Sequence, residues 1–148
     1  MFKLETLLEI RKRREEEANV KLSQAHAVLR AAKEFLQQLQ TQQLEAFAEF
    51  RQKQANKEVS VTDCQVWYNF LSFLKKEIER QEIVVEEAKQ AVLVALKEVE
   101  MAMKDRKTVE RLKEKRLEQY RIEVLKEEQK ILDEIAVSRH GRQEGDEL

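Results

Sequence analysis

The side chains best suited to chemistry are few and far apart in this sequence. Two histidines, His26 and His140, and one cysteine, Cys64, supply all of its imidazole and thiol groups. A metal site needs several such ligands close together, and a reactive thiol needs basic neighbours, whereas Cys64 follows Asp63. The chain also lacks a glycine-rich phosphate loop and a nucleophile paired with a base. We therefore expect no catalytic residue, no metal and no cofactor, and a protein that is not an enzyme.

The basic run at residues 11–14 is the strongest candidate for phosphate contacts. Three glutamates at residues 15–17 follow it directly, so opposite charges recur at i,i+4 spacing along one helix. The whole chain carries 28 Lys and Arg against 29 Asp and Glu. Its net charge of −1 gives no field that would attract nucleic acid or an anionic membrane. A nucleic-acid-binding helix pair is therefore a weak hypothesis.

Long helices must position whatever surface this chain uses. Its two glycines both lie beyond residue 140, it has no proline, and 39% of its residues are charged, a composition typical of helices wound on one another. Mostly apolar residues recur at alternating steps of four and three from Leu4 to Phe50, and again from Trp67 to Val109. We call these two series the seams. Their heptad spacing predicts left-handed supercoiling of each helix against a partner helix.

The helical pattern lapses between Asn56 and Asp63, where β-branched and capping residues gather. A capping box of Thr62 with Gln65 fits the start of a second helix, and Ser60 with Asp63 fits almost as well. This is the place where the chain can reverse direction.

We therefore predict an all-α fold, a two-helix antiparallel left-handed coiled-coil hairpin with a longer, overhanging second helix. A single domain spans residues 1–138, with helices over about 4–57 and 63–138, a turn over about 58–62 and a disordered tail over 139–148. Such a turn sets opposite each other residues whose numbers sum to 120 or 121, as in the pairs Leu36 with Val85 and Ala25 with Ala95.

Two apolar surfaces exceed what the hairpin can bury. Beyond about residue 118 the second helix has no partner in the chain, yet Tyr120, Val124, Ile131 and Ile135 form an apolar stripe at helical spacing. We expect another protein to cover this stripe; the alternatives are fraying or a second copy of the hairpin. The other surplus consists of aromatic residues near the turn, of which Phe70 and Phe73 are expected to be partly exposed.

Two stretches resemble the FliJ family of flagellar export proteins. The first is the opening Phe2-Lys3-Leu4-Glu5-Thr6-Leu7-Leu8-Glu9-Ile10-Arg11, with Glu15 and Ala18 after it. The second is residues 107–136, through Glu110, Leu112, Lys113, Arg116, Tyr120, Glu128, Leu132, Asp133, Glu134 and Ile135.

This resemblance implies a non-enzymatic central stalk of the flagellar type III export apparatus. The stalk would bind the hexameric export ATPase, promote its assembly and couple it to the cytoplasmic domain of the membrane export gate, with export chaperones as further partners. It would be cytoplasmic, peripherally associated with the inner-membrane apparatus, with no insertion into the membrane and no nucleic-acid partner. The alternatives are a general coiled-coil export chaperone or adaptor, and the equivalent stalk of a virulence type III secretion system.

The resemblance also assigns residues to the two partner surfaces. The ATPase-binding residues are Leu4, Leu7, Leu8, Arg11, Leu112, Arg116, Tyr120, Val124, Leu125, Glu128 and Ile131. The gate-binding residues are Phe70 and Leu74.

Overall fold

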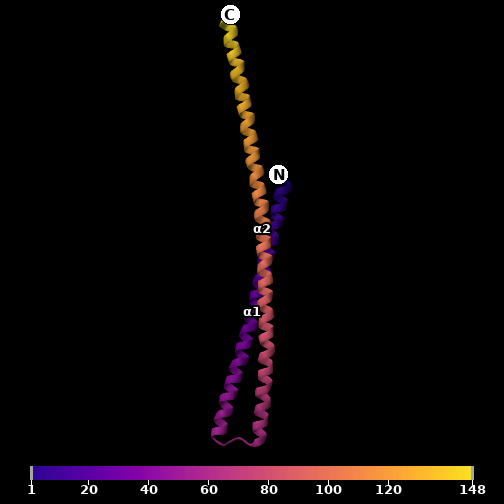
Figure 1. The fold of residues 1–148 in the computed structure, drawn as a ribbon, viewed down its shortest axis with the longest axis vertical. Coiled ribbons are helices and arrows are strands. Elements are labelled where there is room, and N and C mark those ends of the chain that lie inside the picture. The colour runs from indigo at the N-terminus through magenta and orange to yellow at the C-terminus, as the bar shows by residue number, and fades with distance from the viewer. Residues whose placement is uncertain (1, 148) are drawn as a thin grey trace. The chain divides into compact units, whose positions relative to one another are not determined.

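The computed structural model describes residues 2–147, with side chains placed at 3–142 and 145. Two helices, α1 (Phe2–Ala55) and α2 (Val61–Glu147), are joined by residues 56–60 (Figure 1). The described residues contain no strand, and the two helices pack against each other, which confirms the predicted all-α hairpin. Met1 and Leu148, which belong to the predicted domain and tail, lie outside the described residues.

The chain divides into two compact units, which we describe separately. The turn unit is Arg14–Ala102, and the terminal unit combines Met1–Arg13 with Met103–Leu148. In the turn unit every seam residue is buried or half-buried, in agreement with the heptad spacing. Its core cluster centres on Leu74, which is 2% exposed and packs with Leu39, Ala46 and Ile78. The polar seam residue Gln81 has a hydrogen-bond partner on the other helix. Its Nε2 atom donates a hydrogen bond of 3.0 Å to the carbonyl oxygen of Ala32.

In the terminal unit, the start of α1 packs on α2 through Leu4, Leu8 and Val109, all of them buried. Two ion pairs flank this contact. Arg11 lies 3.7 Å from Asp105, and Lys113 lies 3.9 Å from Glu5. These exposed or half-exposed pairs contribute little stability, so the three buried side chains provide most of the packing.

The connection between the helices is built from two capping motifs. At the end of α1, Lys57 has a φ of 56°, the Glu58 N–H donates to the Lys53 carbonyl, and the Lys57 N–H donates to the Gln54 carbonyl. This is a Schellman motif, in which a left-handed residue satisfies the last carbonyls of the helix. At the start of α2, the Ser60 N–H donates to Asp63 Oδ2 (3.2 Å) and the Asp63 N–H donates to Ser60 Oγ (3.1 Å). The capping box is therefore Ser60 with Asp63, and the prediction of Thr62 with Gln65 is wrong.

This choice of cap moves the turn and changes the register of the two helices. The helices end and begin at Ala55 and Val61, two residues earlier than the expected 57 and 63. The ring of Phe50 meets the rings of Trp67 and Tyr68, at centroid distances of 5.8 and 5.7 Å. Near the turn, facing residues thus have numbers that sum to about 117 or 118, about three below the predicted sums of 120 and 121.

The new register predicts a specific crosslinking result. Extended along both helices, the register of the ring contacts predicts that Ala25 faces Val92, with Ala95 about 4.5 Å further along α2. In a Cys64→Ala background, we expect cysteines at 25 and 92 to form an intrachain disulfide readily and cysteines at 25 and 95 to react far more slowly, because disulfide geometry is strict. Non-reducing electrophoresis with mass spectrometry measures the rate at which each of the two disulfides forms. Faster reaction of the 25 and 95 pair would contradict this register.

The last part of α2 also differs from expectation. The helix continues to Glu147, whereas the sequence suggested an end at 138 and a disordered tail. No proline follows Ser138, and a glycine in a helix costs only about 1 kcal/mol, so nothing in residues 139–147 forbids the helix.

The capping box also predicts a pH dependence. Hydrogen bonds from Ser60, first from its backbone N–H and then from its side chain, hold the pKa of Asp63 below its ordinary value. A depressed carboxyl pKa stabilises the fold above the ordinary pKa of about 3.9, and this contribution is lost as the pH falls through the lowered pKa of the folded state. We expect Asp63→Ala to melt below the wild type at pH 6 and the difference to shrink towards pH 2, measured by circular dichroism. The exposed control Glu79→Ala should change little, and a difference that is the same at both pH values would contradict the role of the carboxylate.

Candidate partner-binding surfaces

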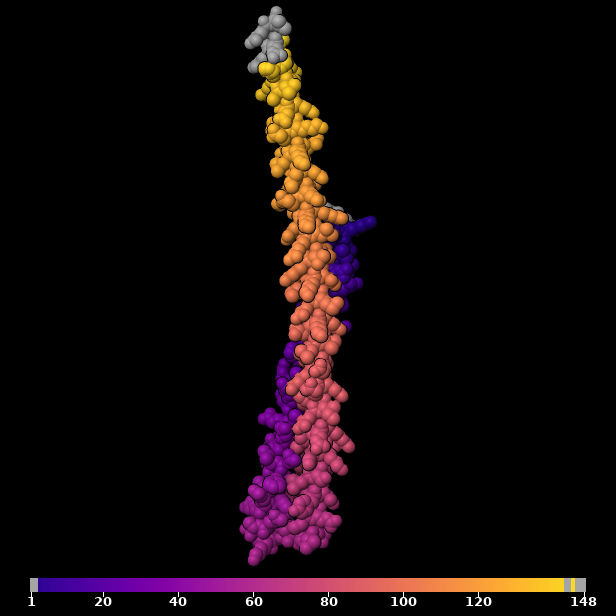
Figure 2. Space-filling model, in the orientation of Figure 1, coloured from indigo at the N-terminus to yellow at the C-terminus, as the bar shows by residue number. Residues whose placement is uncertain are grey.

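The end of α2 presents an apolar face on a helix without a neighbouring helix. Every described side chain from residue 111 onward is exposed, and Figure 2 shows side chains projecting from both visible edges of this segment, coloured orange to yellow. We call residues 117–138 the overhang. Five apolar residues recur at helical spacing along one face of it, and we call them the overhang stripe: Leu117, Tyr120, Val124, Ile131 and Ile135.

The overhang stripe is accessible along its whole length. Its members are 37% to 56% exposed, and Leu125 and Leu132 beside them are 62% and 60% exposed. Apolar side chains lined up at coiled-coil spacing gain nothing from contact with water, because the hydrophobic effect favours their burial. Only Tyr120 falls on the steps of the second seam, and the other four members lie one residue later along α2. A further helix is the natural structure to cover this face.

The structure divides the predicted ATPase-binding residues into two groups. On α1, Leu4 and Leu8 are buried and Leu7 is half-buried, so the two buried leucines hold the terminal unit together and offer no surface. Arg11 is half-buried as well, and its Nε atom has no hydrogen-bond partner among the described residues. The accessible members all lie on α2: Leu112, Arg116, Tyr120, Val124, Leu125, Glu128 and Ile131.

A small hollow lies near the start of the overhang. It is lined by Leu4, Glu5, Lys113, Arg116 and Leu117. Two further apolar residues of the overhang, Ile122 and Val137, are exposed outside the predicted stripe. Ile122 lies on no apolar repeat, whereas Val137 lies on the continued steps of the second seam, which could have indicated it.

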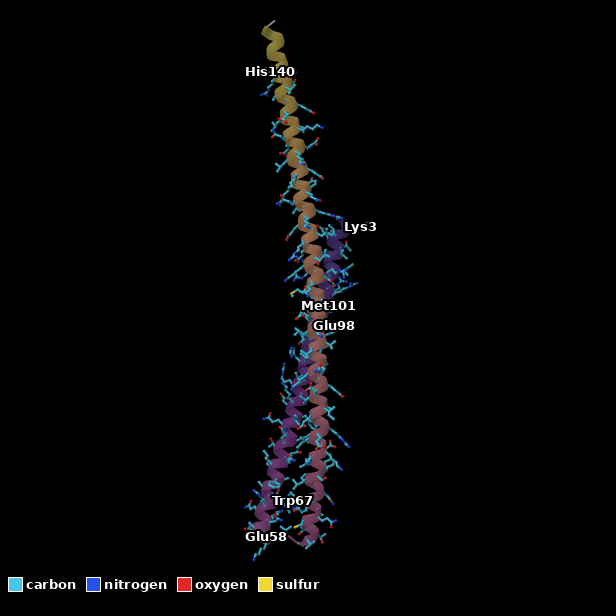
Figure 3. All side chains as sticks on the ribbon, in the orientation of Figure 1. Lys3, Glu58, Trp67, Glu98, Met101 and His140 are labelled. Carbon is cyan, nitrogen blue, oxygen red and sulfur yellow. The ribbon has the colours of Figure 1, made fainter. Side chains whose placement is uncertain are left out.

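The other surplus of apolar residues lies in the turn unit. Phe70 is 43% and Phe73 is 57% exposed, as expected. The ring of Phe70 meets that of Trp67, which lies near the connection (Figure 3), edge-on at 6.3 Å. Leu74, the second predicted gate-binding residue, is in the core and cannot contact a partner while the hairpin stays closed. Phe70 is thus the accessible member of that pair.

A shallow groove lies beside these aromatics. Its lining residues are Gln43, Leu44, Phe47, Tyr68, Leu71, Ser72 and Lys75. The guanidinium of Arg51 stacks over the Phe47 ring at 5.0 Å, and the ammonium of Lys53 lies 5.6 Å from the Trp67 ring centre. Such cation–π contacts keep apolar rings near the surface while shielding one face of each.

The described residues hold no group of three or more metal-ligating side chains. No helix in the part of the chain that the structure describes is long and apolar enough to cross a membrane. The exposed apolar faces on the helices suit the binding of other proteins.

The fold and the two exposed apolar surfaces together define a helical-hairpin protein that can bind other proteins. A family model described as Flagellar FliJ protein matches residues 1–145, and the chain belongs to the FliJ family. It is accordingly a component of the flagellar type III export machinery, and the family is a non-catalytic part of that machinery. Neither the curated proteins nor the solved structures compared with the chain contain a match.

Proposed function

We propose that this protein is the central stalk of the flagellar export ATPase. In this proposal the overhang stripe inserts into the hexameric ATPase and promotes its assembly, while Phe70 in the turn unit contacts the cytoplasmic domain of the export gate. The protein works in the cytoplasm, at the periphery of the inner-membrane apparatus, and export chaperones are further partners. The observation that carries the proposal is the overhang stripe, an exposed apolar face on an unaccompanied helix of a FliJ-family chain.

The proposed contact is of the helix-in-groove kind. An amphipathic helix binds through side chains at i, i+3, i+4 and i+7, and Tyr120, Val124 and Ile131 have this spacing. Charged residues surround the stripe, so polar contacts at the rim can fix the orientation of the helix without providing most of the affinity.

The mechanism would be allosteric. A single asymmetric helix inside a six-fold ring contacts only some of the ring subunits at one time. It favours the subunit conformations that it binds best, and ATP turnover changes only by that difference in affinity. Because this chain supplies no catalytic group in the proposal, any stimulation of turnover arises from ring assembly and from the populations of ring states.

The deciding experiment mixes the protein with the export ATPase of the same flagellar system. We expect a complex, more hexamer in analytical ultracentrifugation and faster ATP turnover. No change in assembly or turnover, together with tight binding of exported subunits, would overturn the stalk proposal in favour of the chaperone or adaptor.

A further inference from the structure

We infer that the overhang also pairs with the overhang of a second copy of this chain, in antiparallel orientation. The pairing would cover the overhang stripe when no other partner does. Three independent features of residues 114–145 support this occupant: the symmetry of the apolar spacing, the placement of charges beside it, and the position of the glycines.

The spacing of four members of the overhang stripe, Tyr120, Val124, Ile131 and Ile135, is the same when read in either direction. An antiparallel pair centred between residues 127 and 128 sets Tyr120 opposite Ile135 and Val124 opposite Ile131 of the second copy, while Leu117 faces Ser138. Each pair occurs twice because of the two-fold axis. Leu125 and Leu132, exposed on one side of the stripe, meet each other across the interface. Every member of the overhang stripe is thereby covered.

The charges beside the stripe favour the antiparallel orientation. In it, Arg139 lies between Glu114 and Glu118 of the second copy, and Lys130 lies between Glu123 and Glu127. Residues on the same side of the two helices pair in this way in antiparallel coiled coils. In a parallel pair the flanking positions would set Arg116 beside Arg121 and Glu118 beside Glu123, so like charges would meet.

Gly141 and Gly145 lie in the segment of each helix that must bend away from the other copy. Beyond Ser138, the helix of the second copy would reach the level at which α1 of the first copy begins. Gly141 and Gly145 are in this stretch, with nothing within 4 Å of the position of a β-carbon. Their low helix propensity lets residues 139–147 diverge from the pair at little cost.

The dimer formed by two overhangs is expected to be weak. It spans three heptads, and Glu127 and Glu128 of the two copies meet at its centre, where their charges repel. We expect a dissociation constant of about 1 to 100 μM for this pairing. The same stripe is proposed above to bind the ATPase, so self-pairing and ATPase binding would exclude each other; this consequence rests on the proposed function, whereas self-pairing does not.

Sedimentation equilibrium of the full chain, without the ATPase, tests the pairing. We expect a monomer–dimer equilibrium that Glu128→Leu tightens by about tenfold, since it removes the central repulsion and adds apolar contact. Glu118→Arg and Arg139→Glu should each weaken the dimer by about three- to fivefold, and the double variant should restore it. Ile122→Gln, on the far face of the overhang, is the matched control and should change the affinity by less than about twofold.

Crosslinking determines the orientation. In a Cys64→Ala background, a chain with Leu117→Cys mixed with a chain with Ser138→Cys should give a disulfide-linked dimer. Leu117→Cys alone should not, because its two copies would lie about 30 Å apart. A protein that stays monomeric to about 1 mM, or a disulfide between two Leu117→Cys chains, would overturn the inference. Either result would leave ATPase binding untouched, and a failure to bind the ATPase would leave the dimer untouched.

Discussion

Replacing Leu74 with alanine is expected to lower the free energy of unfolding of the hairpin by about 2 to 5 kcal/mol. Leu74 is the most deeply buried side chain of the core cluster, and it packs with Leu39, Ala46 and Ile78. Alanine removes three carbon atoms and leaves a cavity that two long helices cannot easily close. Chemical denaturation followed by circular dichroism at 222 nm measures the change.

Phe70→Ala is the matched control for this prediction. Phe70 lies one helical turn earlier on α2 and is 43% exposed, so its truncation should cost less than about 1.5 kcal/mol. If Phe70 contacts the export gate, its variant should lose gate binding while remaining folded. Leu74→Ala should lose gate binding only in proportion to unfolding. Equal stability of the two variants would contradict the assignment of Leu74 to the core.

The sequence was sufficient to predict the parts of the fold that depend on periodicity. Burial in a two-helix hairpin follows the heptad directly, because each helix has one neighbour and one face towards it. All seam positions from Leu4 to Phe50 and from Trp67 to Val109 are accordingly buried or half-buried. The overhang followed from the unequal lengths of the two helical stretches, since α2 extends beyond the residues that can face α1.

The register could not be predicted because it depends on two competing caps of nearly equal strength. Ser60 with Asp63 and Thr62 with Gln65 both fit a capping box, and the choice moves α2 by two residues. The end of α1 depends on Lys57 in the left-handed region, where glycine or asparagine is the usual signal. Neither feature changes the apolar pattern, so the seams agree with more than one register.

The sequence was sufficient to predict which parts of the helices carry the candidate surfaces, but not which of their side chains are accessible. Leu4, Leu8 and Leu74 have the residue type expected of a docking surface, yet each is buried within the hairpin. A resemblance to a family places residues on an element, while packing decides which side of that element is exposed. Ile122 is the converse case, because its side chain is accessible although no apolar repeat includes it.

Replacing Val124 and Ile131 together with glutamine is expected to weaken binding to the export ATPase by about 100-fold, or about 2.7 kcal/mol. Both side chains lie on the overhang stripe and would be covered in the complex, so each loses the free energy of burying an apolar side chain. Glutamine favours helices well, and both side chains are exposed in the free protein, so the melting temperature should stay within about 2 °C of the wild type.

The chain offers a control with the same two chemical changes on other faces of the same helix. Ile122→Gln with Val137→Gln removes one isoleucine and one valine, as the stripe variant does, from positions that are 43% and 73% exposed. Its affinity for the ATPase, measured by calorimetry, should change by less than about threefold. If the two double variants bound equally well, hydrophobicity of the overhang in general would explain the affinity and the stripe would have no special role. If only the stripe variant lost binding while its melting curve was unchanged, the loss would come from the contact itself, because the hairpin that presents the overhang would be intact in both proteins.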